Sequence, residues 1–155
     1  MIKVIVIGPL KSKFIINGVN QYLKWVQPYH KTELIQINLS GNLNNMTAKE
    51  YKDKDYKKFS KYISQDTINI VLDERGKLIS SIEFSKKIES FYLSGKKHIN
   101  FFIGGPLGHD KRMYNHANLL LGLSKMTFTH EMAVLLTLEQ IYRANKIIKN
   151  EKYHY

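Results

Sequence analysis

Two short segments in the last third of the sequence have the composition of a ligand-binding edge. The apolar run at residues 101–103 leads directly into Gly-Gly-Pro-Leu-Gly at residues 104–108, and Leu-Ser-Lys-Met-Thr-Phe follows at residues 123–128. A strand that ends in glycines leaves backbone N–H and C=O groups free, because no side chain blocks the approach of a ligand. The two segments therefore predict a cofactor pocket built largely from main chain.

Common phosphate-binding and metal-binding motifs do not describe this region. The glycine segment lacks the lysine and the Ser/Thr of a Walker loop, and its spacing differs from the dinucleotide fingerprint. No metal is expected, because His109 and His116 are seven residues apart and no two histidines have the spacing of a helical ligand pair. His130 lies beside the predicted pocket, where binding a substrate oxygen and a structural role are equally consistent with its position.

The composition limits the possible classes of function. The 155 residues are enough for one core, so we expect a single domain over residues 1–155. The absence of cysteine excludes disulfides, zinc–thiolate sites and cysteine nucleophiles. Neither a signal peptide nor a membrane span is predicted, so we expect a cytoplasmic protein with no membrane partner. The formal charge of +11 favours a nucleic-acid partner, although a lysine-rich proteome would also explain it.

The elements that must position these residues alternate between strand and helix. Apolar runs predict strands at residues 3–7, 34–39, 68–72, 100–103 and 125–128, and helix-spaced apolar residues predict helices at 14–26, 80–93, 111–121 and 131–149. This order predicts an α/β fold with a mainly parallel sheet and helices on both faces. Ligands of such sheets bind beyond the carboxyl ends of the strands, where the glycine segment lies.

Local signals refine these predictions. Residues 73–76 are predicted to form a turn that closes the third strand, also at a carboxyl end. Ser81, with Ser80 as its competitor, and Thr129 are predicted helix caps. The polar stretch at residues 41–62 favours a solvated loop and helix, although lysines interleaved with tyrosines also suit contact with RNA.

The last predicted helix is apolar on more than one face, which is typical of a helix that packs in a core and against a second subunit. Glu139 within it needs a partner if it is buried, and Arg143, one turn later, is the expected one. Tyr142 and Arg143 begin a basic edge that continues toward the tail. Exposure to solvent and contact with RNA are both consistent with this edge.

Four of these segments together resemble the RlmH family of SPOUT-class methyltransferases. They are the strand with Gly-Gly-Pro-x-Gly, the block Leu-Ser-Lys-Met-Thr-Phe-x-His, the run Glu-Gln-Ile-Tyr-Arg-Ala, and a Tyr-His near the end. The resemblance extends over essentially the whole chain. It implies an α/β fold with a C-terminal trefoil knot, which sequence rules alone would not propose because knots are rare. It also implies a homodimer that uses S-adenosylmethionine to methylate N3 of a pseudouridine in 23S ribosomal RNA within the ribosome.

The resemblance also implies roles for individual residues. On the substrate side, where catalytic residues are expected, it implies His130, Tyr142, Arg143, Tyr153 and His154. In-line methyl transfer depends on positioning, and loss of the N3 proton needs a base, for which His154 or a nearby carboxylate is a candidate. The tail of one subunit would approach the cofactor of the other. The implied cofactor-binding residues are Leu72, Gly104, Gly105, Gly108, Leu123, Ser124, Lys125, Met126, Thr127 and Phe128.

The chain departs from the family pattern at three places. Many members end in Arg or Lys, where this chain has Tyr155, and Arg is common at the position of Val134. The motif histidine is usually preceded by Pro and followed by Pro or Gln, whereas here Thr129 precedes it and Glu131 follows it. Fewer cations on the substrate side predict a weaker grip on RNA phosphate. Two alternatives to the enzyme therefore remain, namely a knotted protein that binds RNA or the ribosome with impaired catalysis, and a nucleotide-binding α/β module.

Overall fold

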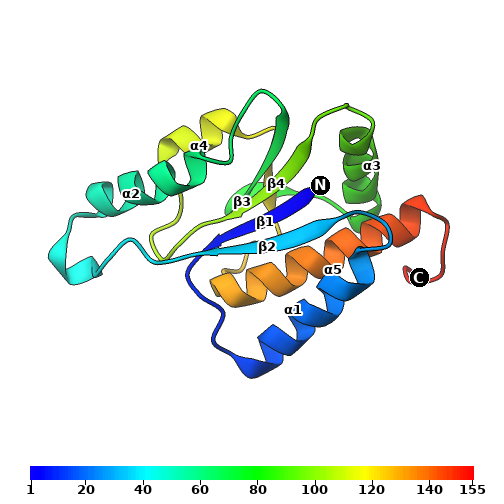
Figure 1. Cartoon of the computed structure of the whole chain (residues 1–155), viewed down its shortest axis with the longest axis horizontal. Helices are drawn as coiled ribbons and strands as arrows, with labels where there is room; N and C mark the ends of the chain where they lie inside the picture. The colour runs from blue at the N-terminus through cyan, green and yellow to red at the C-terminus, as the bar shows by residue number, and fades with distance from the viewer.

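Five parallel strands form the centre of the computed structural model, which describes residues 1–155 (Figure 1). In chain order the elements are β1 (Ile2–Ile7), α1 (Lys13–Val26), β2 (Thr32–Ile37), the 3-10 helix η1 (Leu43–Asn45), α2 (Ala48–Ser60), β3 (Thr67–Leu78), α3 (Ser81–Tyr92), β4 (His98–Ile103), α4 (Lys111–His116), β5 (Leu119–Gly122) and α5 (His130–Ile148). The strands lie in the order β2-β1-β4-β3-β5, and all neighbouring pairs are parallel. Every strand therefore ends at the same edge of the sheet, which confirms the predicted fold class.

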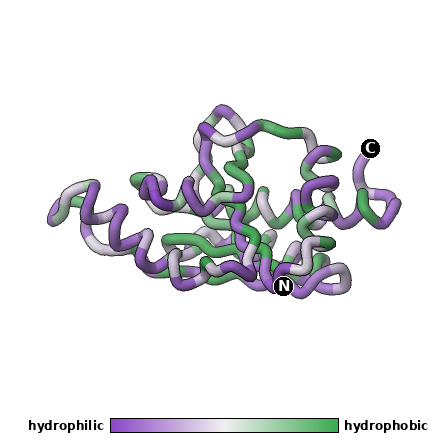
Figure 2. Tube along the Cα trace, turned by 90° about the horizontal axis from the view of Figure 1, so that it is seen from above, coloured by the Kyte–Doolittle hydropathy of each residue, from purple (hydrophilic) through white to green (hydrophobic).

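Helices cover both faces of the sheet because its central strands are apolar on both sides. Val4 and Val6 of β1 belong to a large core that α1, α3 and α5 complete. Ile5 points to the other face and packs in a smaller core with Phe59 of α2 and Met113 of α4. In Figure 2 the strands in the middle of the molecule are mostly hydrophobic, whereas the surrounding segments are largely hydrophilic. None of the helices combines the length and apolarity needed to cross a membrane.

The segment between α4 and α5 differs from the sequence prediction. The predicted helix at residues 111–121 ends at His116, β5 follows, and the strand predicted at residues 125–128 is wrong because those residues form a loop. Asn118 explains the change, because its Oδ1 accepts the N–H of Asn69 at 2.7 Å and its own N–H donates to the Asn69 carbonyl at 2.8 Å. These bonds align the following Leu-Leu-Leu-Gly with β3, so it pairs as a strand although leucine also favours helix.

The end of β3 is also different from the prediction. The sequence predicts a turn at residues 73–76, whereas the strand continues through them. Leu121 of β5 pairs with both Leu72 and Lys77, so the residues between these two bulge out of the ladder. Pairing resumes because Gly76 allows close backbone contact, since a Cβ there would lie 2.5 Å from the backbone of β5. The sequence located the irregularity correctly but was wrong about the end of the strand.

The caps of two helices follow from their first residues. Ser80, rather than Ser81, caps α3, because its Oγ accepts the N–H of Glu83 at 3.1 Å and the Glu83 carboxylate accepts the Ser80 N–H at 2.8 Å. Thr129 caps α5, as predicted, and accepts the N–H of Met132 at 3.2 Å. The second cap fixes the start of the helix beside the carboxyl ends of the strands.

The polar stretch at residues 41–62 contains η1 and α2 and is mostly exposed, as its composition favours. Only one stripe of α2 is buried, formed by Tyr51, Asp55 and Phe59 at intervals of four residues. The helix thereby covers one end of the smaller core, and its remaining faces are left to solvent and to α4.

Candidate functional site

A pocket of about 880 Å³ opens at the carboxyl ends of β3, β4 and β5. Its volume is in the range of small-molecule sites, and its place is the one where open parallel sheets bind ligands. The bulge of β3, the glycine turn after β4, the loop after β5 and the start of α5 all contribute to its lining, together with side chains of α2 and α4. The topology therefore gathers both ligand-binding segments identified in the sequence into one cavity.

The glycine turn after β4 is shaped by two separate requirements. Gly108 has a φ of +75° and its N–H donates to the Gly105 carbonyl at 3.0 Å, which closes a tight turn that glycine forms without strain. At Gly104 a Cβ would lie 3.2 Å from the His109 ring, and at Gly105 one would lie 3.2 Å from the Asp55 carboxylate. These glycines make room for buried side chains as well as for a ligand.

An ionised carboxylate lies in the pocket wall beside the bulge of β3. Tyr114 OH donates to Asp73 Oδ2 at 2.7 Å, Arg75 Nε lies 3.2 Å from Asp73 Oδ1, and Arg75 Nη2 donates to Tyr114 OH at 2.8 Å. Burial acts to raise the pKa of Asp73, but the hydrogen bonds from Arg75 and Tyr114 outweigh it and lower that pKa to about 2. The Asp73 carboxylate is therefore ionised at neutral pH, and its charge is paired with that of Arg75.

The loop after β5 is connected to the same bulge. Thr127 Oγ1 donates to the Glu74 carboxylate, and Ser124 Oγ accepts the N–H of Met126 at 3.0 Å. These bonds hold the loop over the pocket without a strand partner. Lys125 is exposed and is the one predicted cofactor residue that does not contribute to the lining.

The start of α5 forms the remaining wall and is tied to the segment after β1. His130 Nε2 lies 2.9 Å from the Pro9 carbonyl, and because a carbonyl only accepts, Nε2 carries the hydrogen and Nδ1 is an acceptor. The Glu131 carboxylate accepts the N–H groups of Lys11 and Ser12 at 2.5 Å and 2.9 Å. His130 is therefore in the pocket, as expected, with a structural bond that sets its tautomer.

The other residues predicted for the substrate side gather at the opposite end of α5. Arg143 donates to the Glu139 carboxylate through Nη2 at 2.7 Å and Nε at 3.0 Å, which confirms the predicted pair. Tyr153 OH donates to the same oxygen at 3.1 Å. Arg143 Nη1 lies 3.2 Å from His154 Nδ1, and because a guanidinium only donates, this imidazole nitrogen accepts. Glu139 raises the pKa of Arg143 further, so the cation is permanent.

The Arg143 guanidinium lies 4.8 Å from the centre of the Tyr153 ring, and further aromatic rings from α1 and the turn after it gather around Tyr142. The Tyr142 ring centre lies 4.8 Å from that of Tyr153 and 5.4 Å from that of Trp25, and Tyr22 and Tyr29 lie next to it at 6.1 Å each. Trp25 is 41% exposed. Aromatic rings beside a guanidinium are the combination on which unstacked bases bind. We refer to Tyr142, Arg143, Tyr153 and His154 with these rings as the tail cluster.

The pocket and the tail cluster are far apart within one chain. Thirteen residues separate His130 from Arg143, which at about 1.5 Å per residue is roughly 20 Å along the helix. None of the four α5 and tail residues lines the pocket. The sequence-predicted cofactor residues are thus brought together, whereas most of the predicted substrate residues form a second, separate group.

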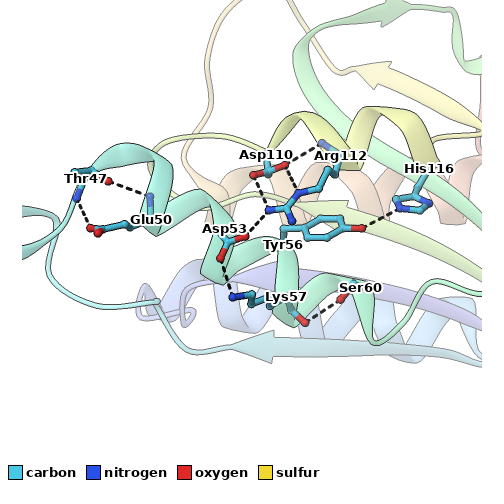
Figure 3. A network of polar contacts seen from close by, with 9 residues as sticks. All are labelled: Thr47, Glu50, Asp53, Tyr56, Lys57, Ser60, Asp110, Arg112 and His116. Carbon is cyan, nitrogen blue, oxygen red and sulfur yellow. Dashed lines mark hydrogen bonds and ion pairs between the residues drawn. The ribbon is translucent and has the colours of Figure 1, made fainter.

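A polar network joins α2 to α4 next to the glycine turn (Figure 3). Arg112 donates to Asp53 at 2.6 Å and to Asp110 at 2.9 Å, and its guanidinium lies 4.0 Å from the centre of the Tyr56 ring. Tyr56 OH is 3.1 Å from His116 Nε2. Because Asp110 also caps α4, the network anchors the chain directly after the turn.

Several lining residues were missed by sequence reasoning. Asp73 and Arg75 fall in the segment predicted as a turn at a strand end, which was the signal available for them. Tyr114 and Lys52 come from helices, and nothing in their sequence context shows that those helices border the pocket. His109 directly follows the glycine segment, but its neighbours in sequence do not reveal that it turns inward.

Two departures from the family pattern have different structural settings. Val134 is fully buried in the large core, so this position does not present a side chain to RNA in the observed fold. The loss of an RNA-binding cation inferred for it is therefore not supported. Tyr155 is fully exposed at the end of the tail. No three histidine or acidic side chains come together in a group that could hold a metal ion.

Comparisons with known proteins identify named relatives of this chain. Two relatives, from Acetivibrio thermocellus and Kosmotoga olearia, are both named ribosomal RNA large subunit methyltransferase H. The first is 40% identical over 156 residues, which cover 99% of this chain and 98% of the relative. The second is 42% identical over 148 residues, which cover 96% of this chain and 95% of the relative. A relative of the same name from Dictyoglomus thermophilum is 42% identical over 154 residues, 99% of both chains.

Structural and family comparisons give the broader assignment. The solved structure of a "probable methylase family protein" from Haemophilus influenzae Rd KW20 aligns with a TM-score of 0.53 and 16% identity, covering 99% of this chain and 70% of that one, which supports the fold alone. A family model described as "Predicted SPOUT methyltransferase" matches residues 1–154. With a family match over almost its whole length and relatives about 40% identical, the chain belongs to the SPOUT methyltransferase family.

Proposed function

We propose that this chain methylates N3 of a pseudouridine in 23S ribosomal RNA, within the ribosome and with S-adenosylmethionine as methyl donor. The observation that carries the proposal is the pocket at the strand ends, which is lined by every predicted cofactor residue except Lys125. Relatives that match the whole chain are named as ribosomal RNA methyltransferases. The formal charge of +11 suits a polyanionic substrate, and a ribosomal substrate is consistent with the expected cytoplasmic location.

The residues of the pocket fit this cofactor. Leu72 and Leu121 offer apolar contact to an adenine ring, and the glycine turn offers backbone groups that no side chain shields. The lining also holds two carboxylates and two cations, Asp73 and Glu74 with Lys52 and Arg75, which can pair with the charged amino and carboxyl groups of the cofactor. When bound there, S-adenosylmethionine supplies an electrophilic methyl group on a cationic sulfur.

The tail cluster suggests how the substrate base is activated. His154 Nδ1 accepts a hydrogen bond from Arg143, so Nε2 carries the proton in the neutral ring. In this state His154 is a donor, suited to a uracil oxygen on which negative charge develops as N3 loses its proton. Glu139 holds Arg143 and thereby keeps the imidazole in this tautomer. For His154 to act as the base, Arg143 would first have to release Nδ1.

A homodimer would complete the site. The pocket and the tail cluster are roughly 20 Å apart along α5, so a reaction that uses both needs the tail of a second copy. Leu135 and Leu136 of the same helix remain partly exposed in the isolated chain, as an interface helix requires. We infer in addition that residues 1–155 form a single domain, with the C-terminal trefoil knot that the family implies.

The direct test is methyl transfer from labelled S-adenosylmethionine to ribosomes that lack the modification, followed by mapping of the labelled nucleotide. We expect label at N3 of one pseudouridine of the large-subunit RNA. Ribosome binding without transfer would favour the RNA-binding alternative. Preferential binding of ATP or a dinucleotide over S-adenosylmethionine would contradict the proposal and favour the nucleotide-binding module.

The shared site is tested by mixing two inactive variants. Arg143→Ala damages the tail cluster, and Gly104→Val fills the pocket turn, so each homodimer lacks a working site. After exchange of subunits, half of the dimers are mixed and each of these has one intact site, which gives about a quarter of the wild-type activity. No recovery after confirmed exchange would show that both groups must act within one chain.

A further inference from the structure

His109 is a buried imidazole that the reaction described above does not use. It follows Gly108 directly and is 5% exposed. Its ring centre lies 5.8 Å from that of Phe59 of α2 and 6.2 Å from that of Tyr114 of α4. The tight glycine turn therefore directs this side chain back beneath the strand ends, where it forms part of the pocket lining.

One ring nitrogen is bonded to the end of β3. His109 Nε2 lies 2.9 Å from the Leu72 carbonyl, and because the carbonyl only accepts, Nε2 carries the hydrogen. Leu72 is the last residue before the bulge of β3, where the ladder with β5 is interrupted. The imidazole thus supplies a hydrogen bond at the point where regular strand pairing stops holding the chain.

The other side of the ring lies against the glycine turn. A Cβ on Gly104 would be 3.2 Å from Cε1 and 3.3 Å from both ring nitrogens of His109, so the ring and this backbone are in close contact. Nδ1 is buried and has no hydrogen-bond partner. Burial lowers the pKa of His109, so the ring stays neutral and has a single tautomer.

We propose that His109 is a positioning residue of the cofactor pocket, which fixes the Leu72 carbonyl and the Gly104 backbone relative to each other. Leu72 belongs to β3 and Gly104 directly follows β4, and both are among the predicted cofactor residues. One rigid ring that touches both sets the spacing between them before any ligand binds, and preorganisation of this kind increases affinity. The proposal rests on the S-adenosylmethionine site proposed above.

Three substitutions separate hydrogen bonding from filling of space. His109→Leu keeps an apolar volume but removes the N–H, so the Leu72 carbonyl loses its donor. His109→Gln retains an N–H that can reach the carbonyl, and His109→Asn carries the same group on a chain that is one methylene shorter. His98→Leu, at the amino end of β4 and outside the pocket lining, is the matched control.

The first measurement is the dissociation constant for S-adenosylmethionine by calorimetry. We expect His109→Leu to bind about tenfold more weakly, and His109→Gln to bind within about twofold of the wild type. In the transfer assay the KM for the cofactor should rise while kcat and the KM for ribosomes change little. Wild-type affinity in His109→Leu would overturn the proposal. If His109→Leu does not fold, the two amide variants are compared instead. We then expect His109→Asn, whose chain is shorter, to bind S-adenosylmethionine more weakly than His109→Gln, and equal affinities would overturn the proposal.

A second measurement does not depend on the cofactor. Amide hydrogen exchange in the ligand-free protein should be faster at residues 104–108 in His109→Leu, and close to wild type in His109→Gln and in the control. Nitrogen-15 spectra of the histidines should show His109 as the neutral Nε2–H tautomer. If the wild type binds no S-adenosylmethionine, the proposed function fails, and exchange that is unchanged in His109→Leu would overturn the positioning role as well.

Discussion

The pocket and the tail cluster lie at opposite ends of α5 and are built by different means. The pocket is formed by strand ends, a glycine turn and a backbone bulge, all held by the ladder of the sheet. The tail cluster is formed by long side chains around Glu139, which are held by hydrogen bonds and ring contacts. One site is thus a property of the fold, whereas the other depends on the contacts of individual side chains.

Both regions contain ion pairs, but their settings differ. In the pocket wall Asp73 pairs with Arg75 beside the bulge of β3, and hydrogen bonds lower the pKa of Asp73 to about 2. In the tail cluster Arg143 pairs with Glu139 within α5, and Lys146 beside it pairs with Glu151 at 2.6 Å. The following changes either break one region alone or sharpen the contrast between them.

The largest effect is expected where the pocket depends on contact between two backbones. In Gly76→Val the new Cβ would lie 2.5 Å from backbone atoms of β5, which cannot retreat within the sheet. We expect a loss of about 3 kcal/mol or more in the free energy of unfolding, or no soluble protein at all. Thermal unfolding measures this. Gly95→Ala, where a Cβ meets nothing within 4 Å, should cost only about 1 kcal/mol.

The next effect concerns the tail cluster. Arg143→Ala removes the donor that sets the His154 tautomer, so kcat/KM for methyl transfer should fall roughly 100-fold. The dissociation constant for S-adenosylmethionine should stay within about twofold, because Arg143 does not line the pocket. Lys86→Ala, on the surface of α3, serves as the control. Equal loss of cofactor binding in Arg143→Ala would show that the two regions are not independent.

Asp73 tests the charge of the pocket through pH. Its pKa is lowered from 3.8 to about 2, so the ionised form is favoured in the folded state. This stabilisation is present above pH 3.8 and is lost as the pH falls toward 2. Asp73→Asn should therefore cost about 2 kcal/mol at pH 7 and progressively less in acid, as measured by urea unfolding. Asp66→Asn, at an exposed pair, should change stability by less than about 0.5 kcal/mol at every pH.

The smallest effect is expected at the cap of α5, which lies on the pocket side of the helix. Thr129→Ala removes the acceptor for the N–H of Met132 and should cost about 1 kcal/mol of stability. Thr129→Ser keeps the hydroxyl and should lose little of this energy. Equal free energies of unfolding in the two variants would mean that Glu131 and the segment after β1, rather than the cap, hold the first turn of α5.

Much of the fold could be predicted because the signals are local. Apolar spacing located α1 and α5 to within a residue or two, and Thr129 marked the start of the last helix. The same reasoning misplaced β5, because a leucine run is compatible with helix and strand. Its pairing was decided by Asn118 bonding to Asn69, a contact between residues 49 positions apart.

The candidate site was also predicted only in part, and again the local signals were the ones that could be read. Most of the residues that line the pocket could be predicted because a ligand-binding turn has a compact pattern of glycines, and because the family motifs preserve their order. Tyr114 and His109 were missed because they contribute to the site through contacts with Asp73 and Leu72 of β3, which are distant from them in the sequence. Such contacts have no periodicity in the sequence, so no local rule detects them.

The sequence by itself determined the class of fold, the glycine turn, the cap of the last helix and the family, because each depends on residues that are close together in the chain. The tertiary structure decided the bulge of β3, the inward position of His109 and the separation of His130 from Arg143 along α5. These features depend on pairing between distant segments and on the length of a rigid helix. The physical reason is that backbone preference is local, whereas packing and site geometry are not.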